Sequence, residues 1–307
     1  MTRVVALVGP TGSGKTELSL ALAARWNAEI VNADSRQVYR RLDIGSAKPT
    51  AAQRALVPHH VLDVVEPDER FDCARYRELA LAAIADITGR GKRVLLVGGT
   101  GLYIKVLLRG VFAGPARDPE LRARLEQHEA AEPGRLHRQL AAVDPASAAR
   151  LHPHDRVRLI RALEVWELTG QPISAWQAAH AFAEAPFETL LLGLSLPRAE
   201  LYARIDARCA AMVRDGLVDE VRALYASGLD PELPALRSLG YREIGAYVRG
   251  RCDLPAALAA MAHATRRFAK RQLTWFRGDS QVVWRSPEIT ELQSAIDSLW
   301  GRGTPGR

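Results

Sequence analysis

Short apolar runs alternate with amphipathic stretches along the first hundred residues. Val4–Val8 is a β-branched run of the kind found in buried parallel strands, and Ile30–Val31 and Val94–Val97 repeat the pattern. Between them, Thr16–Trp26 and Arg75–Thr88 carry apolar residues three or four apart and are predicted helices. Because strands that alternate with helices form a parallel sheet with helices on both faces, we predict an α/β fold.

The pattern changes after Pro115. From Asp118 to Trp176 every apolar spacing is helical and no strand is predicted, whereas strand patterns return at Leu190–Leu196 and Val282–Trp284. We therefore predict a parallel-sheet core flanked by helices over residues 1–115 and 187–300, with a helical C-terminal part. An all-helical insertion domain at 116–186 interrupts this core, and a disordered tail at 301–307 follows it.

A glycine-rich loop lies between the first predicted strand and the first predicted helix. Its residues satisfy the pattern G-x-x-x-x-G-K-[ST]: Gly9, Pro10, Thr11, Gly12, Ser13, Gly14, Lys15 and Thr16. In such a P-loop the backbone N–H groups and the helix N-terminus bind phosphate oxygens, the lysine reaches the outer phosphates, and the hydroxyl can hold Mg²⁺. The motif predicts a phosphate or diphosphate site without identifying what the phosphates are attached to.

In most nucleotide hydrolases one strand ends in an acidic residue that helps to hold the metal, and the third predicted strand of this chain lacks one. Val94–Val97 ends in Gly98-Gly99-Thr100-Gly101 with no acidic residue, which argues against a motor protein or a signalling GTPase. Asp34 instead follows the second strand, at the sheet edge where ligands of open α/β folds bind. It can serve as a general base or can cap a turn before Ser35, and the sequence leaves both interpretations open.

Composition and charge narrow the class of protein. The 307 residues are 48% apolar and 25% charged, which is typical of a folded chain. The net charge of +7 favours polyanionic partners, and three separated cysteines form neither a disulfide framework nor a zinc site. No apolar run is long enough to span a membrane, and the N-terminal run is too short for a signal peptide. We expect a soluble cytoplasmic protein, acting as a monomer because no apolar stripe demands a partner.

Two basic segments are candidates for anion binding. Arg204 and Arg208 share one helical face and together suit a diphosphate, although a solvated face paired with nearby acids also explains them. Thr265–Arg277 holds five basic residues, no acidic one, and three aromatic residues. This mixture suits a nucleic-acid backbone, but aromatic residues at helical spacing also belong to helix cores.

Several segments taken together resemble the tRNA dimethylallyltransferase family of bacterial type. They occur in the family's order along nearly the whole chain: GPTGSGKT (9–16), NADSRQVYRRLDIGSAKP (32–49), LLVGGTGLY (95–103), DPELRARL (118–125), RLIRALEV (158–165), LRSLGYREI (236–244) and FAKRQLTWFR (268–277). The P-loop is widespread, whereas DSRQVY and DIGSAKP are far more specific.

The resemblance implies an enzyme that transfers the dimethylallyl group of dimethylallyl diphosphate to N6 of the adenosine 3′ to a tRNA anticodon. The P-loop would then hold the prenyl diphosphate, with Mg²⁺ on Thr16 as cofactor, so no hydrolytic acidic motif is needed. Asp34 would accept the N6 proton, while Thr100 and Arg208 would stabilise the departing diphosphate together with Lys15. The helical insertion and the core would grip the anticodon stem-loop from two sides.

The resemblance also implies a set of tRNA-binding positions. These are Asp34, Ser35, Arg36, Gln37, Thr100, Arg122, Val157, Arg158, Leu159, Ile160, Arg161, Arg237, Ser238, Leu239, Gly240, Tyr241 and Arg242. Val157 stands where the family usually has glutamine, and Arg36 and Gln37 differ from the small apolar residues of other members. The resemblance therefore supports the role of Asp34 more directly than a polar RNA contact at Val157 or the role of Arg36.

Three alternatives remain open on the sequence. A relative that prenylates free adenine nucleotides would share the P-loop and Asp34 but would have little use for the helical insertion. A small-molecule kinase would place ATP in the P-loop and use Asp34 as the base for a hydroxyl. A non-catalytic RNA-binding protein would not need intact Lys15, Thr16 and Asp34.

Overall fold

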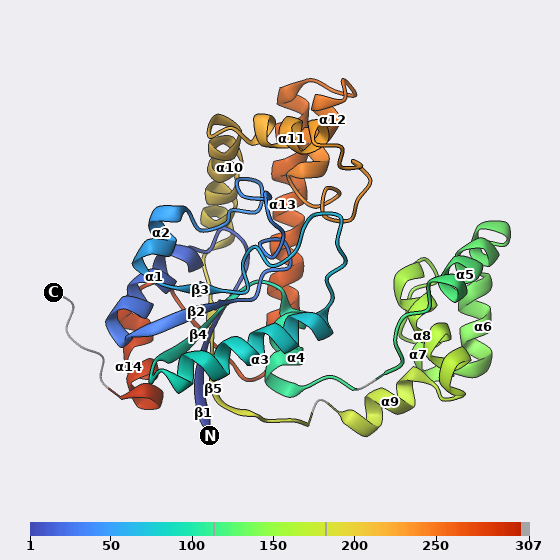
Figure 1. The fold of residues 1–307 in the computed structure, drawn as a ribbon, viewed down its shortest axis with the longest axis horizontal. Coiled ribbons are helices and arrows are strands. Elements are labelled where there is room, and N and C mark those ends of the chain that lie inside the picture. Colours follow the sequence, from blue (N-terminus) through green and yellow to red (C-terminus); the bar gives the residue numbers. More distant parts are fainter. Residues whose placement is uncertain (113, 182, 302–307) are drawn as a thin grey trace. The chain divides into compact units, whose positions relative to one another are not determined.

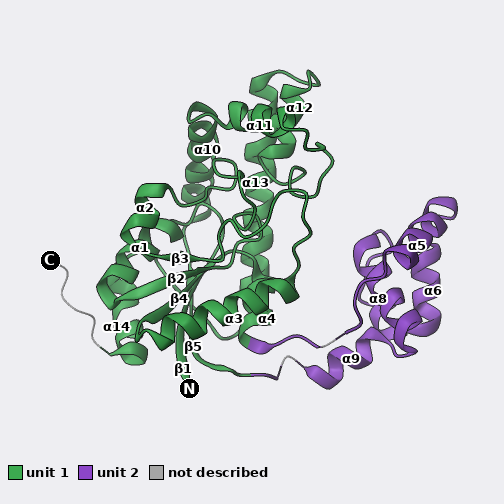
Figure 2. Ribbon diagram, in the orientation of Figure 1, with its two compact units in different colours: residues 1–108, 185–307 green, residues 109–184 purple. Residues whose placement is uncertain are grey.

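A computed structural model describes residues 1–112, 114–181 and 183–301 of the chain (Figure 1). Two compact units make up the fold, residues 1–108 with 185–307 and residues 109–184 (Figure 2). The second unit begins and ends a few residues before the bounds 116 and 186 expected for the insertion. Residues 302–307 of the predicted tail lie outside the described residues.

The first unit is built on a six-stranded parallel sheet in the order β3-β2-β4-β1-β5-β6 (Figure 1). The strands are β1 (Thr2–Val8), β2 (Ala28–Asn32), β3 (His59–His60), β4 (Arg93–Gly98), β5 (Phe187–Leu194) and β6 (Val282–Arg285). Strands from both ends of the chain therefore share one sheet, with β5 hydrogen-bonded to β1 across the whole insertion. The α/β prediction is confirmed.

Nine helices contribute described residues to this unit. They are α1 (Lys15–Trp26), α2 (Ala51–Leu56), α3 (Cys73–Gly89), α4 (Gly101–Arg109), α10 (Arg198–Arg214), α11 (Leu217–Ala226), α12 (Tyr241–Val248), α13 (Leu254–Arg277) and α14 (Ile289–Trp300). Helices α1 and α14 cover one face of the sheet, where Leu22, Trp26 and Ile296 pack on Leu7 and Leu95. Each such side chain contributes about 1.5–3 kcal/mol on full burial, which anchors the central strands.

The parallel register decides where a site can form. Val4–Val8 of β1 pairs residue by residue with Val94–Gly98 of β4, and β2 pairs with β4 on its other side. All these strands consequently end at one edge of the sheet, where the segments after β1, β2 and β4 come together. Ligands of open α/β folds bind at this carboxyl edge.

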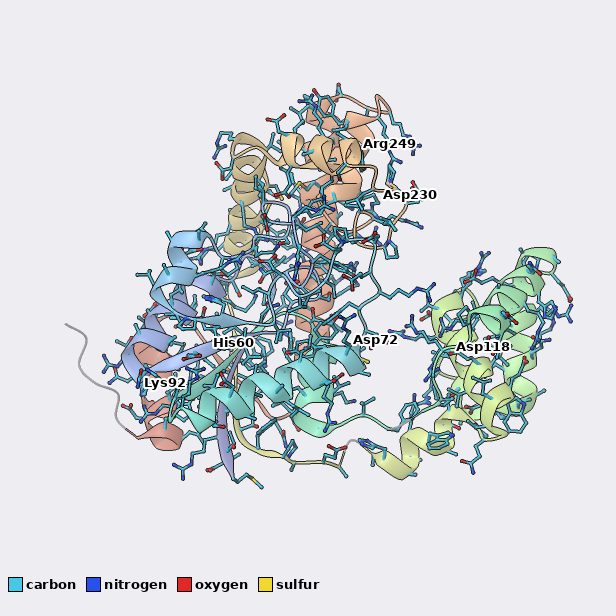
Figure 3. All side chains as sticks on the ribbon, viewed as in Figure 1. His60, Asp72, Lys92, Asp118, Asp230 and Arg249 are labelled. Atoms are coloured by element: carbon cyan, nitrogen blue, oxygen red, sulfur yellow. The ribbon has the colours of Figure 1, made fainter. Side chains whose placement is uncertain are left out.

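The second unit contains only helices among its described residues, as its periodicity predicts. They are α5 (Pro119–Ala131), α6 (Arg135–Val143), α7 (Pro145–Ala148), α8 (Arg156–Thr169) and α9 (Ile173–His180). Leu125, Leu136, Leu140 and Leu159 form its core and are almost completely buried. Asp118, labelled in Figure 3, caps α5 by accepting a hydrogen bond from the Leu121 amide.

Three elements of the first unit, the strand β3 and the helices α2 and α4, were not predicted. Two residues are too few to show strand periodicity, and α2 buries none of its residues, so no apolar stripe marks it. A capping box between Thr50 and Gln53 begins α2 instead. In the described part of the chain, no helix combines the length and hydropathy needed to cross a membrane.

Candidate active site at the carboxyl edge of the sheet

The P-loop joins β1 to α1 at this edge. Gly14 caps α1 without a side-chain hydrogen bond, so the first amides of the helix are not occupied by a capping side chain. Gly12 has a φ of +85°, and a Cβ there would lie 2.9 Å from Ile205 Cγ1 of α10. The loop therefore needs glycine at this position both for its backbone conformation and for close contact with α10.

Lys15 points back into its own loop. Its Nζ donates hydrogen bonds to the carbonyl oxygens of Gly9 (2.9 Å) and Pro10 (2.7 Å). Burial, assisted by the positive charge of Arg208, lowers the pKa of Lys15 to about 7, while the Asp34 carboxylate acts in the opposite direction. An anionic ligand bound in the loop would favour the charged form of Lys15, because its negative charge would offset the effects of burial and of Arg208.

Arg208 of α10 lies beside Lys15 and is partly buried. One Nη group donates to Thr11 Oγ1, and burial lowers the pKa of the guanidinium. Its Nε and the buried Ser13 Oγ have no hydrogen-bond partner within the described chain. Buried polar atoms are nearly always paired, so these two atoms fit a ligand that supplies acceptor oxygens at the P-loop. Arg204 instead pairs with Glu200 at 2.7 Å, as the solvated-face interpretation expects for this arginine.

Asp34 follows β2 and is oriented by its neighbours. The Asn32 side chain accepts from the Asp34 amide (3.1 Å), and Asp34 Oδ1 accepts from the Arg36 amide (2.8 Å). This is the turn-capping contact that the sequence allowed, and it leaves Oδ2 for other partners. The side chain lines both of the cavities described below, so the carboxylate also faces the space in which a substrate would bind.

Thr100 supports the turn that carries Asp34. Its hydroxyl accepts a hydrogen bond from the Ser35 amide (3.0 Å), and its own amide donates to the Ala33 carbonyl (3.1 Å). Among the described residues, those lining the two cavities include Asp34 and Arg208 but not Thr100. The structure thus gives Thr100 a direct contact with the 33–35 turn.

Gln272 of α13 joins the P-loop to the loop after β4, and the sequence analysis did not identify it. Its Oε1 accepts from the Thr11 amide (2.8 Å), and its Nε2 donates to the Gly99 carbonyl (2.9 Å). It lies on the buried stripe of α13 with Thr265, Ala269 and Phe276. A glutamine among buried helix positions was the available sequence signal, since buried amides need specific partners.

Two cavities meet at this constellation. A cavity of about 610 Å³ and one of about 1210 Å³ share Thr11, Asp34 and Arg208. The larger also contains Lys15 and Thr16. The smaller cavity has apolar side chains from Met212, Met261 and Phe268 in its wall. It also has guanidinium groups, from Arg36, Arg237, Arg242, Arg267 and Arg271. This site lies entirely within the first unit and combines a phosphate-loop motif, a carboxylate and a basic rim.

In the first unit, most positions expected to contact tRNA line a cavity, whereas Tyr241 is buried. Ser35, Arg36, Arg237, Ser238, Leu239 and Arg242 line the smaller cavity. Gln37 lines the larger one and donates to backbone carbonyls. Tyr241 is only 1% exposed and its hydroxyl donates to Glu220 (2.6 Å), while Gly240, at a φ of +87°, precedes α12. The structure therefore places Tyr241 in the core beneath the surface of this segment.

In the second unit, two of the expected tRNA contacts share one buried carboxylate. Arg122 donates two hydrogen bonds to Glu164 (2.7 and 2.8 Å), and Arg161 donates one (2.6 Å). Burial raises the pKa of Glu164, but the hydrogen bonds from Arg122 and Arg161 outweigh it and lower that pKa to about 2. Arg158 pairs with Asp155, Val157 is 72% exposed, and Leu159 and Ile160 are buried.

Fold and site together define an α/β protein with a P-loop motif between β1 and α1 and with a carboxylate, Asp34, just after β2, which β4 separates from β1 in the sheet. The family described as IPP transferase matches residues 37–279. The tRNA dimethylallyltransferase 1 of Citrifermentans bemidjiense is 53% identical over 92% of this chain and 91% of its own length. That of Geobacter metallireducens is 52% identical over 97% and 95%. The chain therefore belongs to the tRNA dimethylallyltransferase family.

Solved structures agree with this assignment. The tRNA isopentenylpyrophosphate transferase of Bacillus halodurans has a TM-score of 0.71 and 38% identity, covering 98% of this chain and 95% of its own. A eukaryotic dimethylallyltransferase described as acting on tRNA has a TM-score of 0.81 and 27% identity, covering 100% and 82%. The predicted family and fold class are confirmed.

Proposed function

We propose that this protein transfers the dimethylallyl group of dimethylallyl diphosphate to N6 of the adenosine 3′-adjacent to the anticodon of tRNA. The observation that carries the proposal is the shared wall of the two cavities. Arg208 with its unpartnered Nε, the P-loop residue Thr11 and the carboxylate of Asp34 all face the same space. A diphosphate and an amine can therefore be bound next to each other there, and family membership supports this pair of substrates.

Asp34 is the proposed proton acceptor. The lone pair of an adenine N6 is delocalised into the ring, so attack on the allylic carbon is helped by a carboxylate that accepts an N6 proton. The new N6–C1 bond forms as the C1–O bond to diphosphate breaks, and the proton passes to Asp34 and then to solvent. Because Asp34 Oδ1 is held by the Arg36 amide, its second oxygen is the one we assign to the amine.

Lys15 and Arg208 are the proposed diphosphate ligands. Their charges would stabilise the negative charge that grows on the bridging oxygen, and preorganised donors of this kind supply a large part of catalysis in water-excluded sites. The described residues contain no group of three His, Cys, Asp or Glu side chains able to hold a metal. Thr16, on the wall of the larger cavity, fits Mg²⁺ held mainly by diphosphate and water, where the ion would add positive charge.

The tRNA is proposed to bind through the basic rim of the smaller cavity and through the second unit. The target adenosine must leave its stack to reach Asp34, at a cost of a few kcal/mol that is smallest in a single-stranded loop. Arg237, Arg242, Arg267 and Arg271 would meet RNA phosphates or bases on the way. Action as a monomer in the cytoplasm stays a prediction.

The decisive experiment incubates the purified protein with Mg²⁺, dimethylallyl diphosphate and an unmodified tRNA that has adenosine next to its anticodon. Nuclease digestion and mass spectrometry then detect an adenosine heavier by one five-carbon group. We expect this product with tRNA or its anticodon stem-loop. Product from free adenine nucleotide alone would assign the chain to the nucleotide-prenylating relatives, and ATP consumption without tRNA would assign a kinase.

A further inference from the structure

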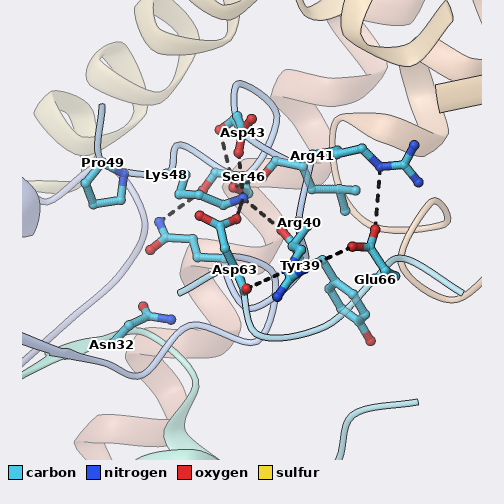
Figure 4. Close-up of polar contacts among 12 residues, drawn as sticks. Asn32, Tyr39, Arg40, Arg41, Asp43, Ser46, Lys48, Pro49, Asp63 and Glu66 are labelled. Atoms are coloured by element: carbon cyan, nitrogen blue, oxygen red, sulfur yellow. Dashed lines mark hydrogen bonds and ion pairs between the residues drawn. The ribbon is translucent and has the colours of Figure 1, made fainter. Parts of the chain in front are cut away.

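A second group of charges adjoins the site, centred on the buried side chain of Lys48. Its side chain is 0% exposed, and its Nζ donates to the Tyr39 carbonyl (2.8 Å) and to one oxygen each of Asp43 and Asp63 (both 2.6 Å) (Figure 4). An ammonium group has three N–H bonds, and three acceptors use all of them. Lys48 thus has no donor left for a bound diphosphate, although it lies in the wall of the larger cavity.

Asp63 links Lys48 to a second cation. Its other oxygen accepts from Arg54 at 2.6 Å. Burial raises the pKa of Asp63, but the hydrogen bonds from Lys48 and Arg54 outweigh it and hold that pKa below its usual range. The carboxylate therefore stays ionised, and removal of Lys48 would leave one of its oxygens without its cation.

These charges join two strained stretches of backbone. Arg41, Ala47, Val61 and Asp63 have φ values between +53° and +63°, a region that favours glycine, and they are four of the six such non-glycine residues described. Each such residue costs about 1–3 kcal/mol and persists where its surroundings hold it. Lys48 supplies that restraint, because it bonds to residues on both stretches.

The restrained segment, residues 43–48, forms part of the substrate site. The Glu220 carboxylate of α11 accepts from its first amides, Ile44 N at 2.8 Å and Gly45 N at 3.2 Å. Gln37 Nε2 donates to the carbonyls of Ser46 (3.2 Å) and Ala47 (3.0 Å). Ser46 and Ala47 line both cavities together with Asp34. The segment is thus fixed by Glu220 at one end and by Lys48 at the other.

We infer that Lys48 is a positioning residue: its buried ammonium holds residues 43–48 in the strained conformation that completes the wall shared by both cavities. Through Gln37 this wall is connected to the turn that carries Asp34, three residues earlier in the chain. The inference rests on the proposed function, because it takes the wall to be part of the site for the transfer reaction. Lys48 touches no substrate, and its loss is expected to misplace the reacting groups while the P-loop itself stays intact.

A second buried ion network offers a matched control at the opposite end of the sheet. Glu29, near the start of β2, has a 5% exposed side chain and pairs with Arg90 and with His60 at 2.7 Å (His60 is labelled in Figure 3). Each network is centred on one buried charged side chain, a cation at Lys48 and an anion at Glu29, whose partners are more exposed. Only the Lys48 network borders the cavities, so Glu29→Gln should lower stability without altering the site.

The test compares the wild type with Lys48→Met, Lys48→Arg and Glu29→Gln. Urea unfolding gives each variant's stability, and kinetics with dimethylallyl diphosphate and tRNA are measured at a temperature where every variant is folded. Inorganic diphosphate, titrated as a competitor, reports on the P-loop alone. Amide hydrogen exchange of residues 44–48 reports the segment directly and needs no activity.

For Lys48→Met we expect kcat to fall at least 30-fold, diphosphate affinity to change less than 3-fold, and exchange at residues 44–48 to rise at least 10-fold. Lys48→Arg should recover part of kcat, and Glu29→Gln should keep kcat within 3-fold of the wild type. If Lys48→Met does not fold, Asp63→Asn replaces it, with the same direction expected.

Three results would overturn the inference. They are wild-type kcat in Lys48→Met, an equal loss of kcat in Glu29→Gln, and unchanged hydrogen exchange at residues 44–48. If the wild type modifies no RNA, the proposed function fails. The exchange measurement still decides whether Lys48 holds the segment.

Discussion

Replacement of Gln272 tests how the site is assembled, because this side chain bridges the P-loop and the loop after β4 through two hydrogen bonds. Gln272→Ala leaves the Thr11 amide and the Gly99 carbonyl without their partner, at a position that is 6% exposed. Each buried polar group left unpaired costs about 1–3 kcal/mol, so two of them give about 2–6 kcal/mol. Water entering from the cavities would satisfy part of this demand, which favours the lower end of the range.

Urea unfolding followed by circular dichroism measures this loss of stability, with Thr274→Ala on the exposed side of α13 as the control. Gln272→Glu separates stability from ligand binding. It keeps an acceptor for Thr11 but loses the donor to Gly99 and adds a negative charge beside the P-loop, so inorganic diphosphate should bind at least 10-fold more weakly. The reasoning is refuted if Gln272→Ala loses less than about 1 kcal/mol, the typical net worth of one hydrogen bond.

Three further substitutions test other parts of the structure. Asp34→Ala should keep tRNA affinity within a few-fold and lower kcat by about 10²–10⁴-fold, the usual worth of a general base; a near-normal rate would remove Asp34 from the mechanism. Gly99→Ala places a Cβ 2.2 Å from Gln272 Nε2, so its urea midpoint should fall as in Gln272→Ala, and wild-type stability would contradict the packing. Glu164 has a pKa lowered to about 2 in the folded state, so the stability it contributes is complete above its unfolded value near 4.5 and is lost as the pH falls from there towards 2. The difference in unfolding free energy between the wild type and Glu164→Gln should therefore shrink from pH 6 to pH 3.5, whereas a constant difference would show that the ionised carboxylate is not the cause.

Much of the fold follows from local patterns. The strands at Val4–Val8 and Val94–Val97 are short, apolar and bounded by glycine, so their type and approximate ends can be predicted from the chain alone. The helix-only stretch from Asp118 to Trp176 is equally clear from its spacing. The strand β3 escaped prediction because its two residues pair with β2 through backbone bonds that no side-chain pattern encodes.

The candidate site divides in the same way. By itself the sequence determined the P-loop, Asp34 and the family, because each depends on residues that are close along the chain or arranged in a fixed order. Only the tertiary structure decided that Gln272 reaches Thr11 across 261 positions, that Arg208 lies beside Lys15, and that Lys48 is fully paired. These contacts join segments that are distant in sequence, and a buried polar side chain finds its partner only after the sheet and helices have brought those segments together.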